Sequence, residues 1–147
     1  MRPLVLLTLA FLATVAGAAE TPIGSVKEVS GAAFIHSGGA RRAAALAGPV
    51  FRDDTLETGA NGALGVLFVD DSRLSLGPDT SLTIDEYVFT PAAKKGSFVS
   101  RLGRGTLLYV SGLIAKLSPQ SAAIETPVGT VGIRGTKLLV VLEGVQP

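Results

Sequence analysis

An eight-residue rhythm of apolar pairs constrains the fold of this chain more than any other feature of its sequence. The rhythm runs through the segment VLFVDDSRLSLGPDTSLTIDEYVF, residues 66–89. The two members of each pair are two residues apart, and each pair begins eight residues after the previous one: Val66/Phe68, Leu74/Leu76 and Leu82/Ile84. Side chains two residues apart share one face of a strand but not of a helix. The rhythm therefore predicts short strands joined by tight turns.

Two arrangements of these strands agree with the rhythm. The strands form antiparallel hairpins in a sandwich or roll, or they stack as rungs of a solenoid-like coil in which each unit contacts its neighbours. Composition favours a single all-β domain, because 147 residues suffice for one modest core and the 18 glycines and 8 prolines are typical of many turns. We expect an all-β fold and leave the strand order open.

The first 18 residues have the pattern of a secretory signal peptide. Arg2 provides a positive charge, residues 4–15 are apolar, and residues 16–18 (AGA) offer a cleavage site of small side chains. An uncleaved anchor is the alternative, but the apolar run is shorter than the roughly 20 residues that a spanning helix needs. We expect a mature chain of residues 19–147 without a membrane span, located in a bacterial periplasm or outside the cell.

The charge balance argues against nucleic acid as a partner. The chain has 13 Lys and Arg residues, and loss of Arg2 with the signal peptide leaves 12, equal to the 12 Asp and Glu residues. The basic doublets Arg41-Arg42 and Lys94-Lys95 are isolated in the sequence. Nucleic-acid binding needs a concentrated positive face. Cysteine is absent, so no disulfide can stabilise the exported chain.

Catalysis by a nucleophile would rest on His36, since the chain has one histidine and no cysteine. His36 has no acidic neighbour nearby in the sequence, and we expect an exposed or loosely packed side chain. We expect no enzymatic activity and no cofactor.

The acidic residues between the apolar pairs allow two interpretations. Calcium binds clusters of oxygen ligands, and the candidates are Asp70, Asp71, Asp79, Asp85 and Glu86. No calcium-binding loop of the helix-loop-helix type is present. Asp71-Ser72 and Asp79-Thr80 fall at equivalent places in the rhythm, where such side chains hydrogen-bond turn backbone. We favour the turn interpretation and predict no metal site.

Arg134 is the most conspicuous charge, since it lies between glycines and apolar strand sequence. A structural role would pair its guanidinium with loop carbonyls or with a carboxylate such as Asp70 or Asp85. A functional role would anchor a partner. We favour the structural role.

Three blocks of the sequence together resemble the FecR domain family. Residues 52–59 (RDDTLETG) resemble its GD-x-[IL]-x-TG signature, and residues 68–78 (FVDDSRLSLGP) resemble its F-x-DGS-x-L-x-LGP block. Residues 125–136 (ETPVGTVGIRGT) are similar to its TP-x-x-x-x-G-[IV]-RGT ending. The blocks occur in the family's order, and the resemblance covers about residues 24–142, which is nearly all of the mature chain.

The resemblance implies an all-β fold and a sensing or interaction role. The family takes its name from the regulator of ferric-citrate uptake. There the domain lies in the periplasm and receives a signal from an outer-membrane transporter by protein contact, while a cytoplasmic segment controls a sigma factor. We expect a structural role for the motif positions, which are Asp54, Thr58, Gly59, Asp70, Asp71, Ser72, Leu74, Leu76, Gly77, Pro78, Thr126, Pro127, Gly132, Arg134, Gly135 and Thr136.

The sequence departs from the family pattern in three respects. Asp53 and Asp71 replace glycines, and aspartate tolerates the left-handed backbone region that such turns require. A signal peptide stands in place of the cytoplasmic segment and anchor, which leaves direct control of a sigma factor without support. The sequence stops soon after the third block, where family members usually continue with strand sequence. If the closing strand is missing, we expect residues 137–142 (KLLVVL) to form an exposed apolar edge that self-associates or pairs with a partner; the alternative is that the sequence is a fragment.

These observations predict an exported, non-enzymatic module that binds a protein partner of unknown identity in the cell envelope and acts in signalling. The alternative is a structural module that self-associates through its C-terminal strand. A sensor of calcium or another small ligand is the third candidate.

Overall fold

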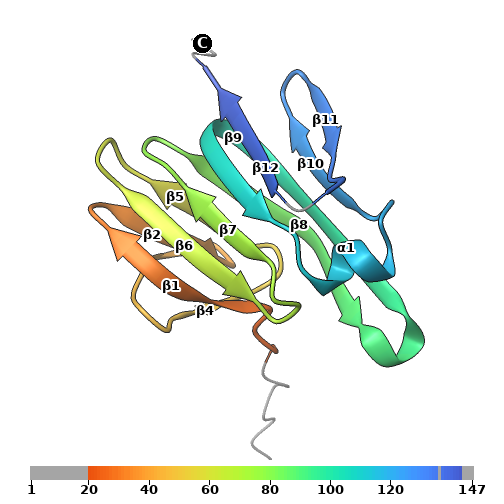
Figure 1. Ribbon diagram of the computed structural model, residues 1–147. Helices are drawn as coiled ribbons and strands as arrows, with labels where there is room; N and C mark the ends of the chain where they lie inside the picture. The colour runs from red at the N-terminus through yellow and green to blue at the C-terminus, as the bar shows by residue number, and fades with distance from the viewer. Residues whose placement is uncertain (1–19, 136, 144–147) are drawn as a thin grey trace, which may run out of the picture.

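The computed structural model describes residues 20–135 and 137–143, and the predicted signal peptide and Thr136 lie outside them. The fold is all-β, as predicted (Figure 1). The first strands are β1 (Gly24–Ser30), β2 (Ala33–Ser37), β3 (Ala40–Ala43), β4 (Pro49–Val50), β5 (Thr55–Thr58) and β6 (Ala63–Phe68). Then follow β7 (Arg73–Leu76), β8 (Ser81–Thr90), β9 (Lys95–Val110), β10 (Ala122–Thr126), β11 (Gly129–Gly132) and β12 (Lys137–Leu142). A 3-10 turn, η1 (Pro91–Ala93), and a short helix, α1 (Leu113–Leu117), complete the elements.

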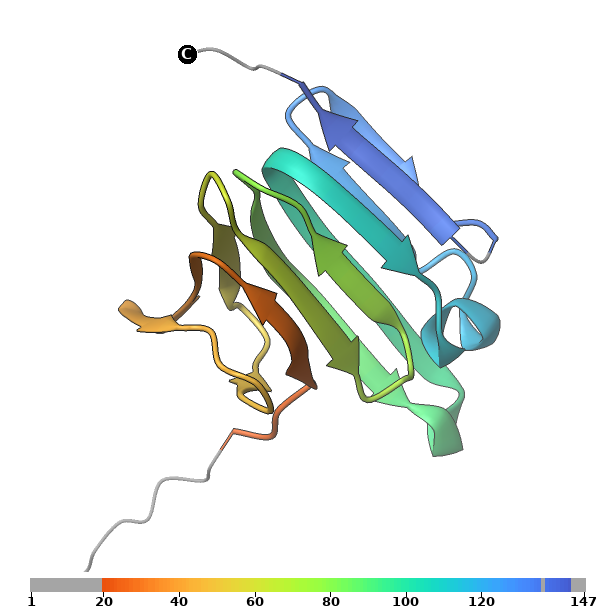
Figure 2. The ribbon, with the colours of Figure 1, turned by 60° about the vertical axis from the view of Figure 1, so that its left-hand side comes forward.

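The strands form one sheet that curls into a half-barrel, as the view in Figure 2 shows. Its main path runs β3-β2-β5-β8-β9-β7-β6-β1-β4. The sheet has two halves, one with β3, β2, β5 and β8 and the other with β7, β6, β1 and β4. The long strand β9 connects them, because its residues 95–104 pair with β8 and its residues 107–110 pair with β7. Gly105 lies between these segments with φ +94°, and a Cβ there would meet Thr80 Oγ1 at 2.2 Å. The bend that joins the halves therefore requires glycine.

The strands of the eight-residue rhythm form a roll and no solenoid. β6 and β7 form an antiparallel hairpin, but β8 crosses to the other half of the sheet and pairs with β5 and β9. The inward direction of the apolar pairs is as expected, since all six side chains are buried: Val66, Phe68, Leu74, Leu76, Leu82 and Ile84. The eight-residue spacing therefore repeats the strands and their buried side chains, but successive strands do not all pair with each other, since β8 does not pair with β7.

The core between the two halves contains a cluster of four aromatic rings. Phe68 stacks on Tyr87 with ring centroids 5.4 Å apart, and Phe98 stacks on Tyr109 at 5.0 Å. Phe68 and Phe98 meet edge to face at 5.5 Å, which joins the two stacked pairs. These rings come from β6, β8 and β9. The cluster thereby packs the hairpin of one half against the long strands of the other.

The turns of the first two motif blocks contain aspartate in the left-handed region. Asp53 has φ +69° and Asp71 has φ +67°, as expected for residues that replace glycines. Asp79 also lies there, with φ +51°. Aspartate is among the non-glycine residues that this region accepts.

The C-terminal strands extend both halves beyond β9. β10 runs parallel to the first half of β9 and pairs on its other side with β11, while β12 pairs antiparallel with the last residues of β9. No strand pairing joins β11 to β12 within the part of the chain that the structure describes. The half-barrel therefore has an open seam, by which we mean the free sides of β11 and β12. No helix among the same residues is long and apolar enough to cross a membrane.

Candidate functional site: an open sheet edge

The first motif block holds the loop before β5 to the β2–β3 hairpin. Asp54 is buried, and its Oδ1 accepts a hydrogen bond of 2.5 Å from the Ser37 hydroxyl. Its Oδ2 accepts one of 2.9 Å from the backbone N–H of Phe51 and lies 3.8 Å from Nη2 of Arg42. The buried carboxylate therefore has polar partners both in its own loop and on the β2–β3 hairpin. Asp54 is oriented inward and leaves no oxygen for a ligand at the surface.

Thr58 and Gly59 form hydrogen bonds with the segment that connects β7 to β8. The Thr58 hydroxyl donates to the carbonyl of Gly77 at 2.6 Å and accepts from the N–H of Thr80 at 3.0 Å. The carbonyl of Gly59 accepts from the N–H of Asp79 at 3.0 Å. The Leu-Gly-Pro step, with Pro78 after Gly77, therefore lies where the chain passes from one half of the sheet to the other.

Asp70 is the centre of the second motif block. It is buried in the β6–β7 turn, and its Oδ1 accepts hydrogen bonds from the Ser72 hydroxyl at 2.6 Å and from the Tyr87 hydroxyl at 2.8 Å. Its Oδ2 accepts from the N–H of Ile114 at 3.1 Å, and its carbonyl accepts from the N–H of Leu113 at 2.8 Å. Asp70 thus satisfies N–H groups at the start of α1, which have no partner inside the helix.

The sequence did not indicate three hydrogen-bond partners of Asp70, which are Tyr87, Leu113 and Ile114, or the close approach of Gly112. A Cβ on Gly112 would lie 2.3 Å from the carbonyl oxygen of Asp70, so glycine is required where α1 approaches the turn. The Asp-x-Ser spacing indicates the local bond to Ser72. No local pattern indicates partners 17 and 44 residues away.

Burial beside this carboxylate changes the acidity of both tyrosines. Loss of solvent raises the pKa of Tyr87 far above its ordinary value, and the negative charge of Asp70 and the hydrogen bond to it raise that pKa further. Loss of solvent raises the pKa of Tyr109 from 10.0 to about 12. Both hydroxyls therefore stay protonated well above neutral pH and have no role as bases.

The third motif block forms the β10–β11 turn and the linker to β12. The Thr126 hydroxyl, next to Pro127, donates to the carbonyl of Gly129 at 2.8 Å. Gly132 ends β11, and a Cβ added there would meet nothing within 4 Å. Gly135 has φ +95°, and its carbonyl accepts a hydrogen bond of 2.8 Å from the Ser111 hydroxyl.

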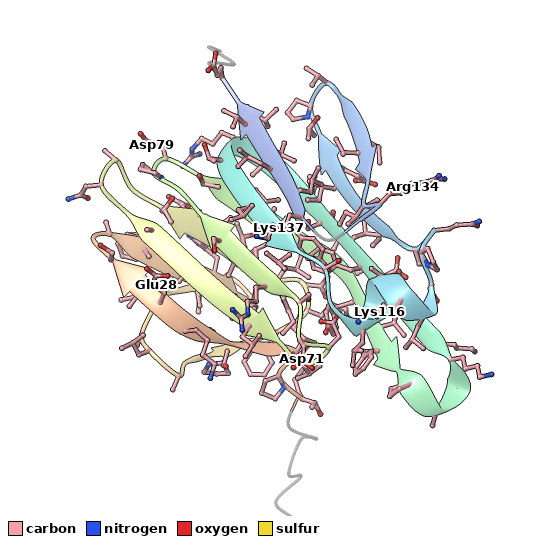
Figure 3. All side chains as sticks on the ribbon, viewed as in Figure 1. Glu28, Asp71, Asp79, Lys116, Arg134 and Lys137 are labelled. Atoms are coloured by element: carbon pink, nitrogen blue, oxygen red, sulfur yellow. The ribbon has the colours of Figure 1, made fainter. Side chains whose placement is uncertain are left out.

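The prediction that the Arg134 guanidinium pairs with Asp70 or Asp85 was wrong. Asp70 is enclosed by the groups described above, and Asp85 pairs with Arg101 at 3.0 Å. The Arg134 side chain is exposed and extends away from the ribbon (Figure 3). It forms no ion pair and no side-chain hydrogen bond with residues 20–135 or 137–143. The exposed guanidinium of Arg134 is therefore accessible to a partner, which is the other role considered for it.

The acidic residues of the rhythm do not converge on one point. Asp70 is buried, Asp71 and Asp79 lie at turns, and Asp85 is bound to Arg101. Among the described residues, no group of three His, Cys, Asp or Glu side chains could hold a metal ion. His36 is partly exposed, and its Nε2 lies 3.1 Å from Oε2 of Glu57. This pair lies on the surface of the sheet, and the partner comes from β5.

β12 is an apolar strand at the edge of the sheet. Leu138, Val140 and Leu142 face inward and pack against the core while staying partly accessible. Leu139 and Val141 face outward with 62% and 52% of their surface exposed. Alternate residues of an edge strand also direct their backbone N–H and C=O groups away from the sheet. Among the described residues β12 pairs only with β9, so it combines exposed apolar side chains with backbone groups that have no strand partner there.

A basic cleft adjoins the start of this strand. It has a volume of about 600 Å³ and is lined by Ser111, Ala115, Lys116, Pro119, Gln120, Ile133, Arg134 and Gly135. Its walls come from Ser111, which follows β9, from α1 and the loop after it, and from the β11–β12 linker. Lys116 and Arg134 are the charged residues that line it, and none of the described lining residues is acidic. Figure 3 labels both residues together with Lys137, the first residue of β12.

Comparison with known proteins agrees with the motif blocks. The family model described as FecR protein matches residues 54–146, which is more than half of the chain. The match includes the second and third blocks and begins at Asp54 within the first. No curated protein and no solved structure matches the chain.

Proposed function

The chain belongs to the FecR protein family, and on this premise we propose that it is an exported, non-enzymatic module that binds a protein in the cell envelope. Family membership indicates a role in signalling or regulation. The proposal adds the location and the mode of contact, in which an extended segment of the partner pairs with β12. The family motifs serve as supports that fix the turns and hold the two halves together.

The edge strand is the observation that carries this proposal. Strand addition needs unpaired backbone groups for affinity and side-chain positions on alternating faces for specificity. β12 offers both over six residues, from Lys137 to Leu142. Natural edge strands are commonly protected by charge, proline or a bulge, whereas residues 138–142 are all apolar. Such an edge favours pairing with another strand.

Two further features support export and a non-enzymatic role. Residues 1–18 have the charge, apolar and cleavage regions of a signal peptide. The buried carboxylates of Asp54 and Asp70 are enclosed by hydrogen bonds that hold the fold together. They are therefore unsuited to act as general acids or bases toward a substrate at the surface.

Site-specific photo-crosslinking in the native organism tests this function. A photoreactive side chain at Leu139, on the outer face of β12, should give one defined adduct with an envelope protein. The same group at Leu46 is the matched control, because Leu46 is 65% exposed but lies in the loop before β4. The adduct from position 139 should disappear when Val141→Lys is added, since a charge on an edge strand opposes pairing.

The result that would overturn the proposal is equal labelling from both positions, or an adduct that survives Val141→Lys. Recovery of the protein from the cytoplasmic fraction alone would contradict the export that the proposal includes.

Self-pairing of β12 is a second candidate function, and the charges near its ends favour it. If two copies pair antiparallel with Val140 opposite Val140, Lys137 of one copy lies opposite Glu143 of the other. Opposite charges at such positions stabilise a strand pair. Light scattering over a concentration series should then detect a dimer that Glu143→Lys abolishes and that Lys137→Glu combined with Glu143→Lys restores. A monomer at every concentration would exclude this candidate.

A further inference from the structure

We infer that the partner segment carries an acidic side chain at its C-terminal end, which Arg134 and Lys116 bind in the basic cleft. The inference rests on the proposed function, because it names the chemistry of the strand that pairs with β12.

The position of the cleft relative to the edge strand is the first argument. The linker that contains Ile133, Arg134 and Gly135 runs from the end of β11 to the start of β12, so it bounds one end of the open seam. Two of the cleft walls are this linker and α1. A strand that pairs along β12 therefore has one of its ends beside the cleft.

The charge of the cleft is the second argument. Arg134 and Lys116 line the same cleft, and neither has an ion-pair partner within the described residues, whereas Arg42, Arg52, Arg101 and Arg104 have acidic partners. A guanidinium binds a carboxylate through two parallel hydrogen bonds, and an ammonium adds a second positive charge. A carboxylate side chain is thus the group that complements this cleft.

Strand direction assigns the acidic residue to one end of the partner. Antiparallel pairs outnumber parallel pairs in proteins, and β12 itself pairs antiparallel with β9. A partner antiparallel to β12 ends near Lys137, where β12 begins. The acidic residue therefore lies C-terminal to the paired stretch.

The inner face of β12 indicates which other side chains the partner segment carries. Leu138, Val140 and Leu142 pack against the core but stay partly accessible, and they belong to the strand that borders the seam. A strand added beside them covers this surface if its alternate side chains are apolar. The partner is therefore an extended segment with alternating apolar residues followed by Asp or Glu.

A displayed peptide library tests the inference with the mature chain. Random peptides of about ten residues, a usual strand length, are fused to a carrier at both ends so that no free carboxylate is present. Selected sequences should share an alternating apolar stretch with Asp or Glu after it. Selection against Arg134→Gln combined with Lys116→Gln should retain the alternation and lose the acidic preference. Lys27→Gln, an exposed change on β1, is the matched control and should retain both.

Calorimetry with one selected peptide gives the magnitude. Replacement of its acidic residue by Gln, or Arg134→Gln in the protein, should weaken binding by about fivefold. The two changes together should weaken it little further, because they remove the same contact.

The outcomes separate this inference from the proposed function. Alternating peptides without an acidic preference would overturn the inference and leave strand addition intact. If no peptide depends on β12, as judged by loss of binding in Val141→Lys, the proposed function fails and the inference fails with it. Acidic residues enriched before the apolar stretch would contradict the strand direction.

Discussion

The hydroxyl of Tyr87 on β8 donates a hydrogen bond of 2.8 Å to Oδ1 of Asp70, in the turn between β6 and β7. The two residues belong to different halves of the sheet, so this bond joins the halves at one end of the half-barrel. The same carboxylate also holds the start of α1 through Ile114. The family motif therefore joins the β6–β7 turn to β8 and to α1, the helix that follows the segment of β9 with which β12 pairs.

Asp70→Ala should lower the free energy of unfolding by about 3 kcal/mol or more. The substitution removes the acceptor of three buried donors, which are the hydroxyls of Tyr87 and Ser72 and the N–H of Ile114, and each unsatisfied donor costs about 1–3 kcal/mol. Urea denaturation measures the loss. Asp85→Ala removes a partly exposed pair with Arg101 and should cost less than about 1 kcal/mol. Equal losses in both variants would contradict the junction role of Asp70.

The two tyrosines should make the fold sensitive to alkali. Their folded-state pKa values lie above the ordinary 10.0, with that of Tyr109 at about 12. The unfolded chain then releases protons that the folded chain keeps. Their stabilising contribution is complete below pH 10 and is lost as the pH rises toward 12.

The absorbance of tyrosinate follows this transition, since Tyr87 and Tyr109 are the only tyrosines of the chain. It should appear together with the loss of strand structure measured by circular dichroism. Ionisation of either tyrosine near pH 10 in a protein that stays folded would show that its hydroxyl is not buried.

Asp71→Gly should change the free energy of unfolding by less than about 1 kcal/mol, because glycine accepts the φ of +67° without strain. Asp71→Val should lower it by about 1–2 kcal/mol, since a β-branched residue is disfavoured there. Thermal unfolding of the two variants provides the comparison. Equal stability of the Gly and Val variants would show that the turn does not need a left-handed residue at this position.

Two glycines should respond differently to a methyl group. Gly112→Ala should cost about 2–4 kcal/mol, because its Cβ would lie within 2.4 Å of backbone atoms of Asp70 and Ser72. Gly132→Ala should change stability by less than about 0.5 kcal/mol, since nothing lies within 4 Å of the added atom. Urea denaturation again measures both. A reversed order would contradict the close contact between α1 and the β6–β7 turn.

The sequence predicted the local structure of this protein better than its long-range contacts. Apolar pairs such as Leu74 and Leu76 indicate strands and their buried face through side-chain alternation alone. The positive φ of Asp71 follows from turn chemistry in the same way. The crossing of β8 to the other half of the sheet depends on pairing with β9, which no nearby residue indicates.

The site residues show the same limit. Asp70 was identified from a motif, but its partner Tyr87 is 17 residues away and its partner Ile114 is 44 residues away. The carboxylate partners expected for Arg134 were wrong, because Asp70 is buried and bound to Tyr87 and Ile114, while Asp85 pairs with Arg101 across the β8–β9 strand pair. The apolar edge at residues 137–142 could be predicted, since its composition is unusual for an exposed strand.

Hydrogen exchange of the backbone amides of β12 tests the central claim, that this edge strand is the surface that binds the partner. The experiment compares the free protein with its complex with the envelope protein that crosslinking at position 139 identifies. Addition of a partner strand should slow exchange in residues 137–142 by about tenfold or more, because unpaired N–H groups gain hydrogen bonds. Exchange in the β2–β3 hairpin should stay the same. Unchanged exchange in β12, with protection on any other strand, would contradict the account.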